Sequence, residues 1–289
     1  MDRLCKATAE DVRVYAAVTT GLVGEAAKRH RCGALATAAL GRVMTGALLL
    51  AANLKNKECL TVKFQGDGPL GQIVADASAD GAARGYVVHP DVELPLTNGK
   101  LSVGQGVGRG LLSVTRFTGL KEPVTGTCEI FSGEIAEDLT RYLFQSEQTP
   151  SGVGLGVLVG KDGGNEASGG FIVQPLPGAS EETLSRLEKT IAALRPVSSM
   201  VKDGLSASEI VSAILQGFSD VHILSETELA FRCQCSRTRT EEILLTLRDE
   251  DLEQLVEDGQ AEVCCDFCGE KYRFTKEDLL AIREKRRTD

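Results

Sequence analysis

Two closely spaced pairs of cysteines near the C-terminus constrain this chain more than any other feature of its sequence. Cys233-Gln-Cys235 is followed, after 29 intervening residues, by Cys265-Asp-Phe-Cys268. Four thiolates from two short arms can surround one ion in the tetrahedral arrangement that Zn²⁺ prefers. The residues beside the cysteines are polar, which argues against thiols buried in an apolar core. The spacing therefore predicts one four-thiolate zinc site made by these four cysteines.

The composition indicates a folded protein from a reducing compartment. Of the 289 residues, 42% are hydrophobic and 25% are charged, which is ordinary for a folded chain. The nine cysteines are an odd number and too few for a secreted disulfide scaffold of this length. In a reducing compartment, clustered cysteines indicate metal or redox chemistry. The first residues are polar and do not resemble a signal peptide, so we expect a cytoplasmic protein.

The first part of the chain, residues 1–177, mixes helical and strand patterns. Residues 11–52 are predicted to be helical, and Arg42, Thr45 and Asn53 interrupt the apolar stretch at 32–54, which favours a buried core helix over a membrane span. Residues 135–144 form another predicted helix, and 162–164 a predicted turn. Strands are expected at 60–64, 71–75, 83–89, 110–117, 126–131, 153–159 and 169–174. Strands in runs, with helices clustered elsewhere, predict an α+β core domain.

The second part, residues 178–217, is predicted to be an amphipathic helical linker. Ser180 is a suitable N-cap for a first helix, which Pro196 would end. Ser206 and Glu209 form a capping box that begins a second helix. Six apolar side chains recur at helical spacing on these helices: Leu184, Leu187, Ile191, Leu194, Ile210 and Ile214. Such a face must cover another surface or be covered by one.

The third part, residues 218–289, holds the four-cysteine array and has few apolar residues of its own. A capping box at Thr238 and Glu241 predicts the start of a helix between the two cysteine arms, and a final helix is expected from Thr275 toward Arg287. A core this small is marginal without a covalent or metal staple. Metal binding in such a domain would supply much of its folding free energy.

The spacing of the cysteines leaves two roles open for the metal site. The site could be a permanent structural clip, or it could be a redox switch, because oxidised sulfurs no longer bind metal. A disulfide across the C-x-x-C arm would close a ring that is familiar in proteins, whereas one across the C-x-C arm would be tight, strained and easier to reduce, so Cys265–Cys268 is expected to form first and to persist. The residues alone do not decide between these roles.

Motifs along the whole chain resemble one protein family. Around the cysteines the segments are Arg232-Cys-Gln-Cys-Ser236 and Cys268-Gly-Glu-Lys-Tyr272-Arg-Phe274. The remaining motifs are FQGDGPLGQ at residues 64–72, SGEIAEDL at 132–139, SEQTPS at 146–151 and GLGVLV at 154–159. In this order they resemble the 33 kDa chaperonin family of redox-regulated holdase chaperones. The resemblance covers essentially the entire chain.

The resemblance implies a function for each part of the chain. Cys233, Cys235, Cys265 and Cys268 would hold one zinc ion in a reduced, inactive state. Oxidation would form the disulfides Cys233–Cys235 and Cys265–Cys268, release the metal, unfold the zinc domain and destabilise the linker helices. Unfolding client proteins would then bind the exposed apolar face of the linker, in a homodimer and without ATP, under oxidative and heat stress.

The other five cysteines lie outside the predicted ligand set. Cys264 departs from the family pattern, and it could form an alternative C-x-x-x-C pair of metal ligands with Cys268, scramble the disulfides or be a spare thiol beside the site. The remaining four have no partner spacing and are expected to be small buried hydrophobic residues. They are Cys5, Cys32, Cys59 and Cys128.

Two other classes of protein fit the sequence less well. A zinc-ribbon protein that binds nucleic acid needs a basic surface, yet the net charge is −9 and residues 231–289 carry more acidic than basic side chains. An enzyme needs a recognisable site, and neither the three histidines nor the glycine-rich stretches form one. The acidic residues Glu134, Glu137 and Asp138 are interpreted as charges at a helix N-terminus. We therefore expect neither catalysis nor nucleic-acid binding.

Overall fold

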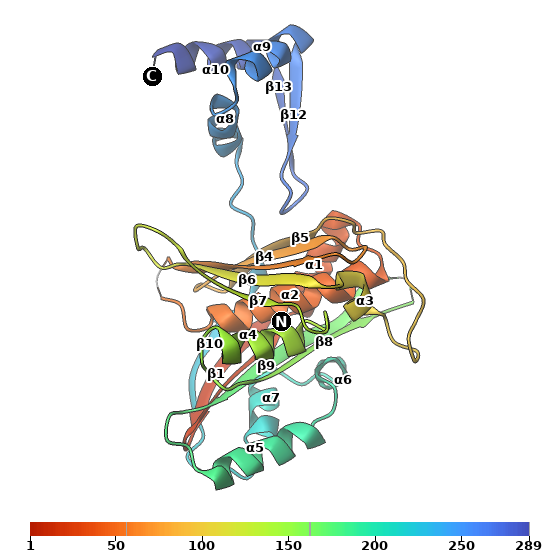
Figure 1. Ribbon diagram of the computed structural model, residues 1–289, viewed down its shortest axis with the longest axis vertical. Helices are drawn as coiled ribbons and strands as arrows, with labels where there is room; N and C mark the ends of the chain where they lie inside the picture. The colour runs from red at the N-terminus through yellow and green to blue at the C-terminus, as the bar shows by residue number, and fades with distance from the viewer. Residues whose placement is uncertain (56, 162, 289) are drawn as a thin grey trace. The chain divides into compact units, whose positions relative to one another are not determined.

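The computed structural model describes residues 1–55, 57–161 and 163–288, and the chain divides into two compact units, Met1–Arg232 and Cys233–Asp289 (Figure 1). Helices and strands occur in both units, which confirms the predicted α+β class. The turn predicted at 162–164 begins at a residue outside the described ones.

The N-terminal unit contains two sheets. The five-stranded sheet is antiparallel, and the six-stranded sheet is mixed because β11 pairs in parallel with β5. The five-stranded sheet has the order β10-β1-β2-β9-β8, and the six-stranded sheet has the order β11-β5-β4-β3-β6-β7. The strands of the first are β1 (Arg3–Ala9), β2 (Val12–Val18), β8 (Gly152–Val159), β9 (Asn165–Pro175) and β10 (His222–Glu228). Those of the second are β3 (Cys59–Gly66), β4 (Gln72–Ser78), β5 (Ala82–Val87), β6 (Gly110–Phe117), β7 (Val124–Glu129) and β11 (Ala230–Phe231). The seven strands predicted between residues 60 and 174 correspond to β3 through β9.

Helix α2 (Ala34–Ala51) is the centre of the N-terminal unit. It packs against β4, β5 and β3 of one sheet and against β8, β9 and β2 of the other. The helix is long and apolar enough to cross a membrane, but 89% of that window is buried inside the protein, as predicted for a core helix. The remaining helices of this part are α1 (Thr20–His30), α3 (Val103–Val107) and α4 (Ala136–Gln145).

The prediction of a helix over residues 11–52 is wrong in its first part. Residues 12–18 form β2, which pairs with β1 and β9, and helix α1 begins only at Thr20. The cause is that β2 is buried on both faces. Val14 and Ala16 pack in one hydrophobic cluster, whereas Tyr15 and Ala17 pack in another. A strand buried on both faces shows no alternation of polar and apolar residues, so its sequence is easily mistaken for a helix.

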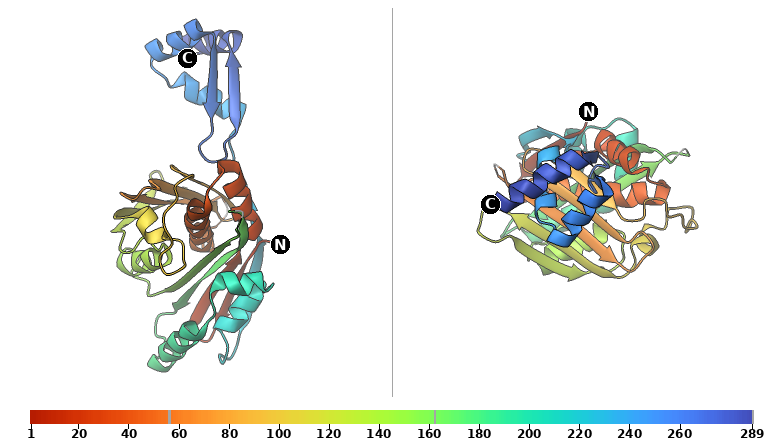
Figure 2. Two further views of the ribbon diagram at one scale, coloured as in Figure 1. Left: turned by 90° about the vertical axis from the view of Figure 1, so that its right-hand side faces the viewer. Right: turned by 90° about the horizontal axis from the view of Figure 1, so that it is seen from above.

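Three helices cover the outer face of the five-stranded sheet (Figure 2). They are α5 (Glu181–Ala193), α6 (Val197–Lys202) and α7 (Ala207–Ile214). Helix α6 packs on β8 and β9, and α7 packs on β1 and β2. The approach of α6 is close enough to require glycine in β8, because a Cβ at Gly156 would lie 2.6 Å from the backbone nitrogen of Ser198.

The capping signals of this helical segment are confirmed, but the predicted number of helices is not. The Ser180 hydroxyl accepts a hydrogen bond from the backbone of Thr183, and Ser206 and Glu209 form the capping box of α7. Two helices joined by a turn were expected, whereas the turn itself contains α6. The first helix ends at Ala193, with Leu194 as its C-cap, and Pro196 serves as the N-cap of α6.

The residues between the linker and the cysteines belong to the N-terminal unit. Strand β10 pairs with β1, and β11 pairs in parallel with β5, so the boundary between the compact units falls at residues 232 and 233. The predicted third part began earlier, at residue 218. The functional division into parts 1–177, 178–217 and 218–289 stays a prediction.

The C-terminal unit consists of a two-stranded hairpin and three helices. The strands are β12 (Gln260–Cys264) and β13 (Lys271–Thr275), and the helices are α8 (Arg237–Leu245), α9 (Asp249–Asp258) and α10 (Lys276–Thr288). The cap predicted at Thr238 is wrong, because Ser236 caps α8. The final helix is confirmed. The hydrophobic core of the C-terminal unit is small and is formed by Leu244, Leu252, Val256, Phe274, Leu279 and Ile282.

Candidate metal centre

The first cysteine arm, Cys233–Cys235, lies in the extended segment between β11 and α8. Hydrogen bonds to the start of α8 fix its conformation. The Ser236 hydroxyl accepts from the backbone N–H of Arg239 at 3.2 Å, and the Arg239 guanidinium donates to the backbone carbonyl of Gln234 at 3.1 Å. The backbone of Gln234, which lies between the two cysteines of this arm, is therefore hydrogen-bonded to a side chain of α8.

The second arm, Cys265–Cys268, is the turn that connects β12 to β13. The Cys265 N–H donates to the Glu270 carbonyl at 2.9 Å, and the Gly269 N–H donates to the Cys265 carbonyl at 2.8 Å. Gly269 has a φ of 72°, a left-handed conformation that glycine adopts without steric cost. This turn directs both cysteine side chains to one side of the hairpin.

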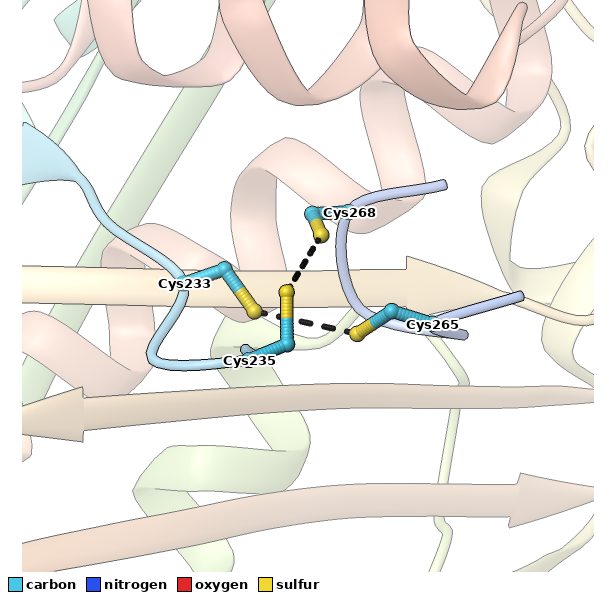
Figure 3. A group of neighbouring side chains, drawn as sticks. All are labelled: Cys233, Cys235, Cys265 and Cys268. Atoms are coloured by element: carbon cyan, nitrogen blue, oxygen red, sulfur yellow. Dashed lines mark hydrogen bonds between the residues drawn. The ribbon is translucent and has the colours of Figure 1, made fainter. Parts of the chain in front are cut away.

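The four predicted sulfurs lie together (Figure 3). The Sγ atoms of Cys233 and Cys265 are 3.8 Å apart, and those of Cys235 and Cys268 are 3.4 Å apart. All four lie within 4.8 Å of one another. Zn–S bonds of about 2.3 Å in a tetrahedron place neighbouring sulfurs about 3.8 Å apart. The four cysteines could therefore hold a metal ion, and their spacing is consistent with zinc.

The surroundings of the second arm favour neutral thiols when no cation is bound. Burial raises the pKa of the Cys265 thiol, and it also raises the pKa of the Cys268 thiol, which is 5% exposed. Backbone N–H groups of Phe267 and Glu270 bond to Cys265 and Cys268 respectively and partly oppose this effect. A bound cation favours the ionised sulfur directly and would overcome the cost of burial.

The structure also brings Tyr272 to the site, a residue that the sequence indicates only as part of a family motif. The Tyr272 hydroxyl lies 3.1 Å from the sulfur of Cys235 and donates a hydrogen bond to it. Tyr272 is in β13, opposite Val263 of β12. Its proximity to Cys235 depends on the hairpin register, which cysteine spacing does not reveal.

The remaining cysteines lie outside the cluster. Cys264 is exposed at the end of β12, opposite Lys271. Cys5 and Cys128 are buried, as expected, whereas Cys32 and Cys59 are only partly buried. Desolvation raises the pKa of the Cys5 thiol to about 11 and that of the Cys32 thiol to about 12. These two thiols are therefore neutral near pH 7.

The predicted client-binding face of the linker is largely covered in this structure. Leu187, Ile210 and Ile214 are buried in the cluster between the linker helices and the five-stranded sheet. Ile191 and Leu194 are partly buried against the same cluster, and Leu184 is 37% exposed. The linker helices thus present most of their apolar face to the sheet.

The acidic residues near α4 have structural roles. The Asp138 carboxylate accepts hydrogen bonds from the backbone N–H groups of Phe131, Ser132 and Ile135, and it is fully buried. Glu134 forms an ion pair with Arg42 at 2.7 Å. Asp138 and Glu137 stand in the first turn of the helix, which agrees with the interpretation as charges at a helix N-terminus.

The fold and the site together define a mixed α+β protein with a cluster of four cysteines that could hold a metal ion in a small C-terminal unit. The Hsp33 protein family model matches residues 2–275. The chain therefore belongs to the 33 kDa chaperonin family.

Individual relatives match along nearly their full length. The 33 kDa chaperonin of Desulforamulus reducens is 47% identical over 98% of each chain, and that of Bacillus subtilis is 46% identical over 99% of each. The crystal structure of the 33 kDa chaperonin (heat shock protein 33 homolog) of Thermotoga maritima superposes with a TM-score of 0.93 at 34% identity, covering 100% of this chain and 99% of the other. Membership of this family supports a chaperone role and, with it, binding of client proteins.

Proposed function

We propose that this protein is a cytoplasmic holdase chaperone that oxidation activates and that works without ATP. In the reduced state it holds one zinc ion and is inactive. The observation that carries this proposal is the convergence of Cys233, Cys235, Cys265 and Cys268, whose sulfurs lie within 4.8 Å of one another. These sulfurs are both metal ligands and oxidisable groups, so one chemical change removes the ligands and the staple together.

Zinc binding to the four cysteines would stabilise a unit that has little core of its own. A bound zinc ion would neutralise thiolate charge and hold the two arms together. Among the described residues of the C-terminal unit, six are buried in its hydrophobic core, which is a small core for a domain of this length. Loss of the ion therefore leaves this unit close to unfolding.

Oxidation with peroxide would convert each cysteine arm into a disulfide. Two thiolates and one peroxide molecule give one disulfide and two hydroxide ions, because the sulfurs lose the two electrons that cleave the O–O bond. We assign the disulfides Cys233–Cys235 and Cys265–Cys268 from the family resemblance. The Sγ distances of 3.8 Å for Cys233–Cys265 and 3.4 Å for Cys235–Cys268 cross between the arms, but the two sulfurs of each arm also lie within 4.8 Å of each other.

Activation would uncover the linker face. Helices α5, α6 and α7 have 13, 6 and 8 residues, and helices of this length are marginal unless they are docked. Their docking buries Leu187, Ile210 and Ile214. Residues 218–232 connect these helices to the C-terminal unit. Because β10 and β11 in this connection pair with β1 and β5, unfolding of the C-terminal unit would make the apolar face available to unfolding clients by loosening these strands as well.

The proposal includes the state and partners of the active form. We expect a homodimer after oxidation, as the family resemblance implies. We expect no partner nucleic acid and no membrane partner, since the net charge of −9 disfavours contact with anionic polymers and surfaces. We also expect no enzymatic activity. Clients would be bound by apolar contact alone.

An aggregation assay tests the proposal. A chemically denatured client is diluted into buffer that contains either reduced, zinc-loaded protein or protein treated with peroxide at mildly raised temperature. The proposal predicts that only the oxidised protein suppresses light scattering, and that a thiol reductant with added zinc reverses the effect. Equal protection by the fully reduced protein would contradict redox activation.

A further inference from the structure

Tyr272 places a hydrogen-bond donor directly on one of the four sulfurs. Its ring packs against the hydrophobic core of the C-terminal unit, and its hydroxyl lies 3.1 Å from Cys235 Sγ. The ring and the hydroxyl therefore have separate environments. Removal of the hydroxyl alone would leave the packing of the ring in place.

The hydrogen bonds to the other arm come from the backbone. Cys265 receives a bond from the Phe267 N–H, and Cys268 receives one from the Glu270 N–H. These donors are part of the turn and cannot be removed by changing a side chain. The donor to Cys235, by contrast, is a phenol hydroxyl, so its effect on the sulfur can be tested by a single substitution.

A hydrogen bond to a thiolate stabilises the charge that the sulfur must share when it attacks an electrophile. The attacking sulfur of Cys235 would lose much of this bond on the way to the transition state, and its reaction would be slowed. A net hydrogen-bond contribution of the usual size changes a rate roughly two- to tenfold. The effect should be confined to Cys235, because the hydroxyl bonds to that sulfur.

We propose that the Tyr272 hydroxyl slows the oxidation of the Cys233–Cys235 arm by its hydrogen bond to the Cys235 sulfur. The proposal rests on the proposed redox function and adds a residue that sets how fast peroxide oxidises the Cys233–Cys235 arm. In the slowed step, the Cys235 thiolate attacks peroxide, the O–O bond breaks, and sulfenic acid and hydroxide form. The Cys233 thiolate then displaces hydroxide from the sulfenic acid, which gives the disulfide.

The test compares wild type with Tyr272→Phe, and Tyr86→Phe serves as the matched control. Tyr86 lies in β5 of the N-terminal unit, where its hydroxyl accepts a bond from Gln72 at 3.4 Å, so its loss removes a phenol hydroxyl far along the chain from the sulfurs. The first measurement is the zinc content of each reduced protein. The second is the rate at which iodoacetamide alkylates each of the four cysteines of the zinc-loaded protein, mapped by mass spectrometry. The third is the rate of zinc release by peroxide.

The proposal predicts equal zinc contents, and alkylation of Cys235 that is roughly two- to tenfold faster in Tyr272→Phe while Cys265 is unchanged. Formation of the Cys233–Cys235 disulfide should accelerate by a similar factor, and Tyr86→Phe should match wild type. Equal alkylation of Cys235, equal acceleration at all four sulfurs, or loss of zinc from reduced Tyr272→Phe would each overturn it.

The alkylation experiment separates this inference from the proposed function. If peroxide releases no zinc from the wild type, the proposed redox function is wrong, and the alkylation rates still decide whether Tyr272 restrains Cys235. If peroxide releases zinc from wild type and Tyr272→Phe at the same rate, with identical alkylation, the inference alone fails.

Discussion

The guanidinium of Arg186 lies over the ring of Phe218, 4.3 Å from its centroid. Arg186 belongs to α5, and Phe218 follows α7, so the contact joins the two ends of the linker. The same guanidinium donates to the carboxylate of Glu10 at 3.2 Å, in the turn between β1 and β2. Arg186 therefore holds the linker helices against the sheet that they cover. Release of these helices is the change that activation is proposed to cause in the N-terminal unit.

Substitution of Arg186 by alanine should loosen the docked linker. The contact with Phe218 is of the cation–π type, and its loss should destabilise docking by about 1 kcal/mol. Amide hydrogen exchange in α5 should therefore become roughly fivefold faster in the reduced protein. Lys189→Ala, an exposed position on the same helix, is the matched control and should leave exchange unchanged. Unchanged exchange in Arg186→Ala would show that apolar packing alone holds the helix.

The linker contact should also depend on pH through Glu10. The backbone N–H and hydroxyl of Ser219, with a smaller effect of Arg186, lower the pKa of the Glu10 carboxyl in the folded state. A carboxyl whose pKa is lowered on folding stabilises the fold above its ordinary pKa of about 4.3, and the stabilisation is lost as the pH falls through the lowered value.

Wild type should therefore unfold at a higher temperature than Glu10→Gln at neutral pH, and this difference should disappear in strong acid. Thermal unfolding of both proteins across the pH range measures it. Both carry the same four cysteines, so protonation of the sulfurs affects them alike. A difference that persisted unchanged below the ordinary glutamate pKa would contradict this role of Glu10.

The four-cysteine centre predicts opposite outcomes for two neighbouring substitutions. Cys268→Ser removes a buried ligand and should abolish tight zinc retention, whereas Cys264→Ser changes an exposed thiol outside the cluster and should leave about one zinc per chain. Zinc content after gel filtration in the presence of a chelator measures both. Loss of zinc from Cys264→Ser would mean that the ligand set includes Cys264.

Phe274 should decide whether the reduced C-terminal unit stays folded. Its side chain is 1% exposed and lies in the small core, beneath the guanidinium of Arg237 at 4.4 Å. Phe274→Ala should destabilise this unit by about 3–5 kcal/mol, which is enough to weaken zinc retention and to give chaperone activity without oxidant. Ile243→Ala, at a side chain that is 59% exposed in α8, should change neither property. Limited proteolysis and an aggregation assay on the reduced proteins distinguish these outcomes.

The sequence was most informative where the chemistry is local. Ser180 and Ser206 are caps because their hydroxyls bond to backbone groups three residues away, and such spacing is visible in the sequence. The strand at β2 was mistaken for helix because its two buried faces depend on the distant linker helices and on α2. Likewise, α6 could not be predicted from a stretch of six residues whose stability comes from packing on β8 and β9.

In the candidate site, too, local features could be predicted from the sequence and contacts between distant residues could not. The convergence of Cys233, Cys235, Cys265 and Cys268 was predicted from spacing, because few arrangements of two short cysteine arms satisfy a tetrahedral ion. The hydrogen bond from Tyr272 depends on how β12 pairs with β13, and the docking by Arg186 depends on contacts with residues far along the chain. Neither leaves a signal in the spacing of residues.

Peroxide titration with zinc release and client protection measured on the same sample tests the central claim most directly. We predict that the reduced protein releases no metal and protects no client, and that protection then rises together with the release of about one zinc per chain. Full protection by protein that still retains all of its zinc would contradict the account.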